Sequence, residues 1–470
     1  MMYLKYFYDT SLAQASYMVG CQATGEAAVI DPSRNIEAYL QIAREQGFRI
    51  TGALETHIHA DFVSGVTELA RRTGATIYYS TEGADNGGYE WNQELPLHGV
   101  THGDEIHVGN IKLKVLHTPG HTPEHVSYEL TDGAATDRPM GVFTGDFVFV
   151  GDVGRPDLLE KSVGVKDSAD KGARQMFKSL QQFKEYGDYL QIWPGHGAGS
   201  SCGKALGAVP TSTVGYERMT NPAFQPTDEQ AFVDFLLDGQ NEPPAYFAKM
   251  KEVNKQAMTP LAEIPAAVEM QGTGDDVAAL AEQHHTMVVD TRSAAAFAMG
   301  SIPGTINLPY PGSFAEWMGR LADYEADIYL IADPADYQEL RRILTGMGMD
   351  RLQGFFATSV VASTSNLRTY TNETPKQVEE RRRHDGVQIL DVRYQDEWDQ
   401  SHVPGAVHVS LQQLPGRTNE LSTEQPVAVH CASGKRSAIA ASILQNHGFD
   451  VINVEGGFMK WKKEQLETTS

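Results

Sequence analysis

The sequence predicts a multidomain α/β protein in which an N-terminal sandwich of two sheets flanked by helices (αββα) precedes two smaller α/β domains. The chain has 470 residues, which is more than a single hydrophobic core usually holds. Strand patterns alternate with helical patterns over residues 1–194, and several of these strands end in His or Asp followed by Gly or Pro. Beyond residue 270, two stretches resemble each other at an offset of 101 positions, as Asp290 and Asp391 show (391 − 290).

The N-terminal half carries most of the strand signals. Residues 1–30 alternate aromatic or aliphatic side chains with polar ones, which predicts strands and a turn at 23–26. A helix-start pattern, Asp31-Pro32-Ser33, precedes apolar residues at helical spacing, and a second helical pattern covers 63–73. Further strands are predicted at 50–55, 75–80, 104–107, 111–116, 126–130, 140–143 and 189–193.

The C-terminal half consists of two copies of one pattern. Residues 288–292 (VVDTR) resemble 389–393 (ILDVR), and residues 302–305 (IPGT) resemble 403–406 (VPGA). Each copy alternates strands with helices, as parallel α/β sheets do. We therefore predict four segments: a first domain at 1–245, a proline-rich linker at 246–265, and α/β domains at 266–360 and 361–470.

Composition narrows the possible partners. The net charge of −23 and the sequence pI of about 5.1 argue against nucleic acid or an anionic membrane as the main partner. Three widely separated cysteines argue against a secreted disulfide framework, and we find neither a signal-peptide pattern nor an apolar run of membrane-spanning length. A cytoplasmic protein is expected, and its acidic surface is compatible with a homodimer or homotetramer.

Histidines and aspartates gather at the predicted strand ends. The stretch 56–65 reads THIHADFVSG between a strand and a helix, 117–122 reads HTPGHT, 144–146 reads TGD and 194–197 reads PGHG. Loops at strand ends can bring side chains from distant positions onto one metal ion. The candidate ligands are His57, His59, Asp61, His121, Asp146 and His196.

These motifs and their order resemble the metallo-β-lactamase superfamily. One position departs from its pattern, because Phe62 stands where a histidine usually completes a second metal site, so one metal per domain is expected. The remaining pattern is most similar to the persulfide dioxygenase branch. That resemblance implies that His57, His121 and Asp146 bind one Fe(II), that O2 is the co-substrate, and that His59, Asp61 and His196 orient ligands or water. A mononuclear zinc hydrolase remains an alternative.

Two further features near this site suggest substrate contacts. The loop 151–157 (GDVGRPD) resembles the family loop that lines the thiol pocket, where Arg155 would pair with a substrate carboxylate or phosphate or else lie on the surface. The loop 195–204 (GHGAGSSCGK) resembles the version in bacterial enzymes fused to rhodanese modules. Its Cys202 is either a participant that holds sulfur or a structural thiol.

The second repeat copy contains a candidate nucleophile. An apolar strand at 427–430 ends at Cys431-Ala432-Ser433-Gly434-Lys435-Arg436, and a helix follows. Backbone amides, the helix N-terminus and two basic side chains favour a reactive thiolate. The loop resembles a rhodanese sulfurtransferase, with Cys431 and Arg436 catalytic and Ser433, Gly434 and Lys435 binding the anion. A Cys-x5-Arg phosphatase is disfavoured, because Arg436 lies only five positions after Cys431.

The first copy lacks this chemistry, since its matching strand leads into Ala332-Asp333-Pro334. The whole order resembles bacterial persulfide dioxygenase–rhodanese fusions of sulfide detoxification, which implies oxidation of a thiol persulfide to sulfite and transfer of sulfur through Cys431 to give thiosulfate. Two alternatives stay open: a glyoxalase II-like thioester hydrolase fused to a rhodanese, and a non-enzymatic sulfur carrier. The sequence leaves glutathione, coenzyme A, bacillithiol and cysteine open as the thiol.

Overall fold

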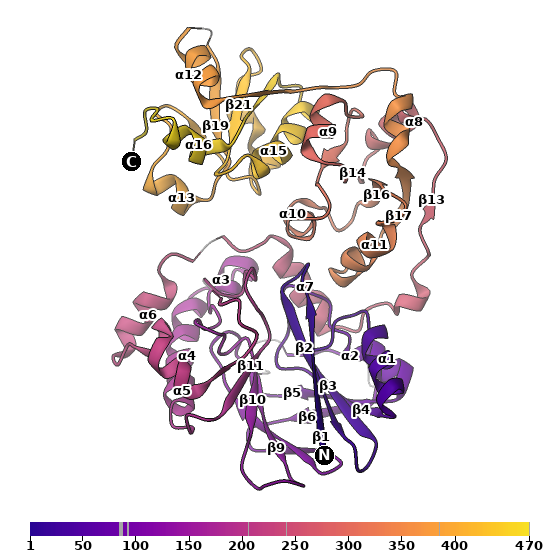
Figure 1. The fold of residues 1–470 in the computed structure, drawn as a ribbon, viewed down its shortest axis with the longest axis vertical. Helices are drawn as coiled ribbons and strands as arrows, with labels where there is room; N and C mark the ends of the chain where they lie inside the picture. Colours follow the sequence, from indigo (N-terminus) through magenta and orange to yellow (C-terminus); the bar gives the residue numbers. More distant parts are fainter. Residues whose placement is uncertain (84–87, 92–93, 205, 241, 385, 470) are drawn as a thin grey trace. The chain divides into compact units, whose positions relative to one another are not determined.

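The computed structural model describes residues 1–83, 88–91, 94–204, 206–240, 242–384 and 386–469. The chain divides into two compact units (Figure 1). The N-terminal unit comprises Met1–Ile264 with Thr345–Gly348, and the C-terminal unit comprises Pro265–Leu344 with Met349–Ser470. In the part of the chain that is described, no helix combines the length and the apolar character needed to cross a bilayer.

Two six-stranded sheets form the centre of the N-terminal unit, as far as its residues are described. The first has the order β1-β2-β3-β4-β5-β6, antiparallel from β1 to β3 and parallel from β3 to β6. Its strands are β1 (Met2–Asp9), β2 (Gln14–Cys21), β3 (Glu26–Ile30), β4 (Arg49–Leu54), β5 (Thr76–Ser80) and β6 (Leu97–Val100).

The second sheet has the order β12-β11-β10-β9-β8-β7, and β10 and β11 are its parallel pair. Its strands are β7 (Glu105–Val108), β8 (Ile111–His117), β9 (Val126–Asp132), β10 (Gly141–Gly145), β11 (Gln191–Pro194) and β12 (Ser212–Thr213). The two-residue edge strand β12 carries too little pattern to be predicted from sequence.

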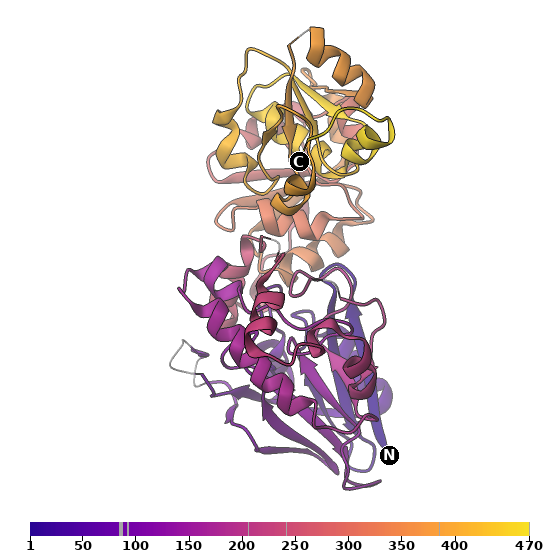
Figure 2. The same cartoon turned by 90° about the vertical axis from the view of Figure 1, so that its left-hand side faces the viewer.

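The two sheets face each other across a buried apolar layer that includes Val19 and Leu54 from one sheet and Val115 and Tyr128 from the other. Helices α1 and α2 bury apolar residues against the outer face of the first sheet, and α4 and α6 do so on the second (Figures 1 and 2). The helices are α1 (Glu37–Gln46), α2 (Val66–Thr73), α3 (Leu158–Val163), α4 (Ser168–Phe183), α5 (Val214–Thr220), α6 (Glu229–Leu237) and α7 (Tyr246–Lys255).

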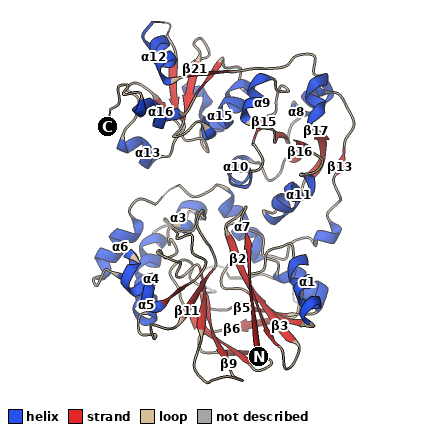
Figure 3. Ribbon diagram, viewed as in Figure 1, coloured by secondary structure: helices blue, strands red, loops and turns tan. Residues whose placement is uncertain are grey.

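The C-terminal unit contains two parallel sheets of the same strand arrangement, with helices around them (Figure 3). The first has the order β13-β17-β16-β14-β15, and the second has the order β18-β22-β21-β19-β20. The first copy comprises β13 (Val268–Glu269), α8 (Gly274–Ala281), β14 (Thr286–Asp290), α9 (Ala294–Met299), β15 (Ile306–Asn307), α10 (Phe314–Leu321), β16 (Asp327–Ala332), α11 (Tyr337–Gly346) and β17 (Leu352–Ala357).

The second copy comprises β18 (Thr371–Glu373), α12 (Pro375–His384), β19 (Gln388–Asp391), α13 (Gln395–Gln400), β20 (Val407–His408), α14 (Leu414–Arg417), β21 (Val427–His430), α15 (Lys435–Asn446), β22 (Val451–Val454) and α16 (Gly457–Lys463). The copies contact each other, because Ser442 Oγ accepts a hydrogen bond from the Asn307 amide (3.0 Å). The αββα sandwich and the two repeated α/β domains confirm the predicted fold class.

Candidate metal centre and cysteine loop

The loop between β4 and α2 carries His57, His59 and Asp61, each at most 4% exposed. Its start is fixed by Asp31, whose carboxylate accepts hydrogen bonds from the Thr56 amide (2.8 Å) and the Thr56 hydroxyl (2.9 Å). A buried loop needs such partners, because unpaired backbone groups in the interior are costly. The loop is therefore held in one conformation from its first residue.

Three of the predicted ligands converge on one point. His57, His121 and Asp146 each offer a donor atom, and these atoms all lie within 4.8 Å of one another. Asp146 Oδ2 is 3.8 Å from His57 Nε2 and 3.5 Å from His121 Nε2. His121 lies in the loop between β8 and β9, and Asp146 directly follows β10. Three strand ends of two sheets thus supply the group.

Hydrogen bonds fix the tautomer of both histidines. The Thr56 hydroxyl gives its proton to Asp31, so its oxygen can only accept from His57 Nδ1, 2.9 Å away. His121 Nδ1 lies 2.9 Å from the Arg155 carbonyl oxygen, which is also an acceptor only. Both Nδ1 atoms therefore carry the hydrogen, and both Nε2 lone pairs face Asp146.

The group fits a divalent transition metal. Burial lowers the pKa of His57 and of His121 well below the usual value, which keeps both imidazoles neutral. Burial also raises the pKa of Asp146 to about 6. Apart from the weakly donating Cys202 thiol, no described residue gives a hydrogen bond to either oxygen of this fully buried carboxylate. A cation would compensate that charge.

Asp61, His196 and Cys202 form a second group of donors. His196 Nε2 is 3.2 Å from Asp61 Oδ2 and 3.4 Å from Asp146 Oδ1, while its Nδ1 is 3.0 Å from the Ala13 carbonyl oxygen. Burial, together with Asp61 and Asp146, raises the pKa of the Cys202 thiol well above its usual value. The second group thus offers three candidate donors without a histidine at position 62, and the raised pKa keeps the Cys202 thiol protonated when no metal is bound.

His59 takes a different direction from the other two loop residues. Its Nε2 lies 3.1 Å from Asp31 Oδ1 and 3.2 Å from Glu55 Oε2, and its ring packs on Phe62 at 4.3 Å. Burial lowers the pKa of His59, but Asp31 and Glu55 outweigh it and hold the pKa well above its usual value. His59 thus forms an ion-pair cluster that anchors the loop beside the first group.

Helix α7 is a part of the site that sequence reasoning missed, because it falls in the segment predicted as a linker. Asn254 Nδ2 donates to the carbonyl oxygens of His59 (2.9 Å) and Phe62 (2.7 Å), and its Oδ1 accepts from the Ser64 amide (2.9 Å). The Tyr246 hydroxyl donates to the Asp61 carbonyl oxygen (3.2 Å). The only available signal was the helical spacing of buried positions within a proline-rich stretch.

Arg155, a predicted substrate contact, is 2% exposed and engaged within the protein. Its Nε and Nη2 both donate to the Asp157 carboxylate at 2.8 Å, and Nη1 donates to the Ser201 carbonyl oxygen at 3.4 Å. Its own backbone amide donates to the Cys202 carbonyl oxygen. In this structure Arg155 joins the loop after Asp146 to the loop of Cys202.

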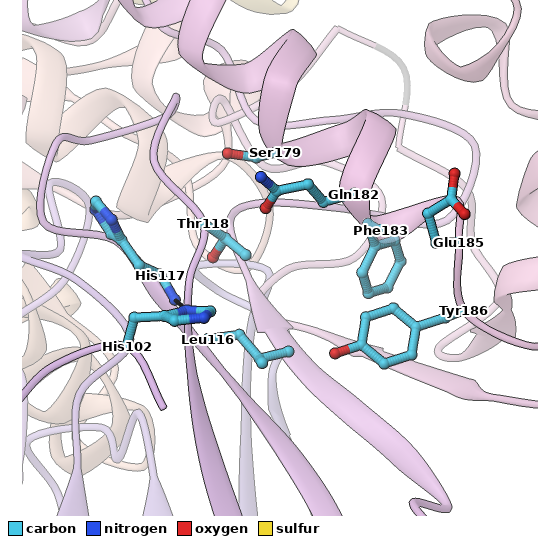
Figure 4. A pocket seen from close by; sticks show the side chains of 9 residues that line it. All are labelled: His102, Leu116, His117, Thr118, Ser179, Gln182, Phe183, Glu185 and Tyr186. Atoms are coloured by element: carbon cyan, nitrogen blue, oxygen red, sulfur yellow. Dashed lines mark hydrogen bonds between the residues drawn. The ribbon is translucent and has the colours of Figure 1, made fainter. Parts of the chain in front are cut away.

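A separate cavity of about 270 Å³ lies beside the end of β8, and the six predicted metal ligands are not among its lining residues (Figure 4). Figure 4 shows His102 and His117 at one side and Phe183 and Tyr186 at the other. His102 Nδ1 accepts a hydrogen bond from the His117 amide (3.1 Å).

Cys431 follows β21 at the start of a loop that runs into α15. The thiol is 1% exposed, and its Sγ accepts a hydrogen bond from the Gly434 amide (3.1 Å). Gly434 has φ +97°, a conformation that favours glycine and turns its amide toward sulfur. Ser433 and Lys435 are exposed at the rim of this loop.

Arg436 points along the rim toward α13. Its Nη1 and Nη2 donate to Glu397 at 2.6 and 2.8 Å, and its guanidinium lies 5.0 Å from the centre of the Tyr394 ring. The predicted catalytic arginine is therefore held by a carboxylate beside the cysteine loop.

The first copy keeps the scaffold of the second without its nucleophile. Arg292 Nη2 donates to Asp290 (2.6 Å) and to the Gly300 carbonyl oxygen (2.9 Å). Arg393 Nη2 makes the same bonds to Asp391 (2.6 Å) and to the Ser401 carbonyl oxygen (2.9 Å). The strand that matches β21 is β16, and Asp333 follows it in place of a cysteine.

Comparison with known proteins assigns families to both parts. Residues 10–196 match the metallo-β-lactamase superfamily, and residues 273–350 and 374–464 match the rhodanese-like domain. A crystal structure described as a metallo-β-lactamase from Staphylococcus aureus is 46% identical, with a TM-score of 0.69 over 76% of this chain and 99% of its own.

Other similarities are more distant. A hydroxyacylglutathione hydrolase from Rhodospirillum rubrum is 33% identical over 38% of this chain and 60% of its own length. The crystal structure of ETHE1 from Myxococcus xanthus is 25% identical, with a TM-score of 0.45 over 54% of this chain and 98% of its own. The chain spans 53–60% of the length of the first curated relatives it matches.

Proposed function

Because the chain belongs to the metallo-β-lactamase superfamily and continues into two rhodanese-like domains, we propose that it oxidises a low-molecular-weight thiol persulfide to sulfite with O2 and transfers sulfane sulfur to sulfite through Cys431. The final products are the thiol and thiosulfate. The proposal joins one oxidation and one sulfur transfer, and each part rests on its own group of residues.

The group of His57, His121 and Asp146 carries the proposal. Two neutral imidazoles and one carboxylate are the donor set that non-haem Fe(II) oxygenases use. Fe(II) held by these residues would supply the redox chemistry that lets O2 react with the persulfide sulfur. These residues would hold the ion in place, because Thr56 and the Arg155 carbonyl group aim the two imidazole rings and the His59 cluster fixes the loop.

The oxidation consumes one water in addition to O2. One persulfide R–S–SH, one O2 and one water give R–SH, sulfite and two protons. The outer sulfur loses four electrons, which O2 takes up, and the bond between the two sulfurs breaks. Burial of the donor group, with His57, His121 and Asp146 each at most 1% exposed, restricts bulk water at the reacting sulfur.

The transfer uses Cys431. Its thiolate attacks the outer sulfur of a second persulfide, so that a new S–S bond forms on Cys431 and R–S⁻ leaves. Sulfite then attacks the outer sulfur of the Cys431 persulfide, which releases thiosulfate, a proton and the thiolate. The Gly434 amide and the N-terminus of α15 stabilise negative charge at this position.

A thioester hydrolase is the second candidate, and two observations favour it. The chain is similar to a protein named hydroxyacylglutathione hydrolase, and the Asp61, His196 and Cys202 group offers donors for a second metal. Such an enzyme binds two metal ions and hydrolyses S-lactoylglutathione without O2.

One experiment separates the two candidates. The chain is purified without oxygen, its metals are measured by elemental analysis, and O2 uptake is recorded with persulfides of glutathione, coenzyme A and bacillithiol. We expect about one iron per chain and O2 uptake that depends on the persulfide. About two zinc ions per chain, hydrolysis of S-lactoylglutathione and no O2 uptake would establish the hydrolase instead.

A further inference from the structure

Lys251 of α7 is a buried cation that the proposed reaction has not yet used. Its side chain is on the face of the helix that contacts the loop between β4 and α2, here called the metal-binding loop. On that face Lys251 lies between Phe247, one turn before it, and Asn254, one turn after it. The residue is 5% exposed. In the described part of the chain, its ammonium group makes no hydrogen bond and no ion pair within 4.0 Å.

Lys251 lies beside the metal centre, because Tyr246 and Asn254, which flank it on α7, donate hydrogen bonds to carbonyl oxygens of residues 59–62. Burial lowers the pKa of Lys251, while the nearby charge of Glu124, and more weakly that of Asp146, opposes the shift. The charge of Lys251 also lowers the pKa of His121, and only burial lowers that pKa more. Glu124 Oε1 already accepts a hydrogen bond from the Ile58 amide, within the same loop.

A lysine placed in this way is costly for the fold, because its ammonium group loses most of its hydration and gains no hydrogen bond or ion pair from the described residues. An arriving anion would supply that partner, and charge-assisted hydrogen bonds in buried sites are the strong ones. The reactants offer such anions, since a persulfide ionises to R–S–S⁻ and sulfite is a dianion at high pH.

We propose that the Lys251 ammonium group binds the anionic sulfur group of the reactant beside the metal position, and that it holds the sulfite product in the same place. This inference rests on the proposed function for the identity of the anion. It makes Lys251 a substrate-binding residue, contributed by a helix outside the strand-end loops that supply the metal ligands.

The test compares Lys251→Met with Lys251→Arg and with a control, Lys249→Met. Lys249 is on the same helix, but it is 37% exposed and pairs with Glu252. The full chain is loaded with Co(II), whose visible absorption reports on ligands at the metal, and is titrated with inorganic sulfite. We expect Lys251→Met to weaken sulfite binding at least about tenfold, Lys251→Arg to recover part of it, and Lys249→Met to match the unmodified chain.

A second measurement excludes a merely structural role. Removing an unpaired buried charge should keep or raise the midpoint of thermal unfolding of Lys251→Met and leave its metal content unchanged. In O2-uptake assays the KM for the persulfide should rise about tenfold or more, and kcat should fall by a smaller factor. Sulfite binding equal to that of Lys249→Met, or loss of metal together with a lower unfolding midpoint, would overturn the role of Lys251.

The two proposals can fail separately. If the iron-loaded chain takes up no O2 with any persulfide, the oxidation proposal fails, yet the Co(II) titration still decides whether Lys251 binds an anion. If O2 uptake occurs and sulfite binds equally well to both methionine variants, only the role of Lys251 is wrong.

Discussion

At the scale of single residues, the metal centre depends on where each imidazole places its proton. Thr56 can only accept from His57 because its own hydroxyl hydrogen goes to Asp31. A chain of two hydrogen bonds therefore turns the His57 Nε2 lone pair toward Asp146. His59, two residues later, meets carboxylates instead and becomes an anchor. Neighbouring histidines thus differ in role because their hydrogen-bond partners differ.

His121→Ala should abolish metal binding at the first group. It removes one of three donors and leaves Asp146 buried beside fewer partners, so we expect iron content to fall from about one per chain to near zero, with O2 uptake lost in parallel. Elemental analysis and an oxygen electrode measure both.

The matched control is His117→Ala, four positions earlier, at the end of β8. His117 Nε2 lies 2.9 Å from the Pro123 carbonyl oxygen, and among the described residues His117 belongs to no group of candidate donors. Its iron content should equal that of the unmodified chain. Iron retained by His121→Ala would show that the metal binds elsewhere.

At the scale of elements, α7 completes the metal-binding loop although it follows the second sheet in sequence. Asn254 bonds three backbone groups of residues 59–64, which lie about 190 positions earlier in the chain. These backbone groups lie between a strand and a helix, so neither a β-sheet nor a helix supplies their hydrogen-bond partners. The side chain of Asn254 supplies these partners instead.

Asn254→Ala should loosen that loop. Three hydrogen bonds of about 1 kcal/mol each are lost, which predicts a destabilisation of about 2–4 kcal/mol and a lower unfolding midpoint, by roughly 5–10 °C. Metal affinity should fall about 10–100-fold, because the loop no longer holds His57 in place. Calorimetry and competition with a chelator measure the two effects, and Glu252→Ala, at an exposed position of the same helix, should change neither.

Gly457, the first residue of α16, sets the position of the cysteine loop. A Cβ atom there would overlap the Cys431 carbonyl oxygen, and its φ is +57°. Gly457→Ala should therefore displace the loop and reduce sulfur transfer to thiosulfate at least about tenfold, while iron content and O2 uptake stay unchanged.

Gly448→Ala is the control for backbone strain. Its φ is +84°, yet a Cβ atom would meet nothing within 4 Å. Both variants should lose about 1 kcal/mol of stability from the left-handed conformation, and only Gly457→Ala should lose sulfur transfer. Equal losses of activity would mean that strain, rather than the contact with Cys431, explains the effect.

The elements explain what the sequence could and could not predict. The strand ends that carry His57, His121 and Asp146 could be predicted from local sequence patterns, because each motif lies within a few residues of its strand. The fixing of His59 by Asp31 and the docking of Asn254 join residues 28 and 195 positions apart, and no periodicity encodes such pairs. The engagement of Arg155 by Asp157 also depends on packing, since the same spacing permits an exposed arginine.

At the scale of the whole molecule, one chain combines a group that fits a metal with a cysteine loop that fits sulfur transfer. The repeat shows which residues of the cysteine-bearing domain belong to its scaffold. Both copies keep an Asp–Arg pair after their first central strand, and only the second copy has a cysteine nucleophile. The pair therefore serves the scaffold, and the chemistry belongs to the loop after β21.

Cys431→Ser should separate the two proposed reactions. O2 uptake should continue at the rate of the unmodified chain, because no metal donor is changed, while the product shifts from thiosulfate to sulfite. Ion chromatography of the products measures the ratio, and Cys21→Ser, which alters a buried cysteine of β2, should leave it unchanged.

A mixture of two variants then tests whether sulfite passes through solution. His121→Ala keeps the cysteine loop and Cys431→Ser keeps the metal donors, so each supplies the step that the other lacks. If sulfite diffuses between chains, the mixture should make thiosulfate at a rate that rises with the concentration of the His121→Ala chain. Sulfite accumulation in the mixture would mean that transfer occurs within one molecule or assembly. An unchanged thiosulfate yield from Cys431→Ser alone would contradict the coupling, because no other residue of the described rhodanese-like domains carries a thiol.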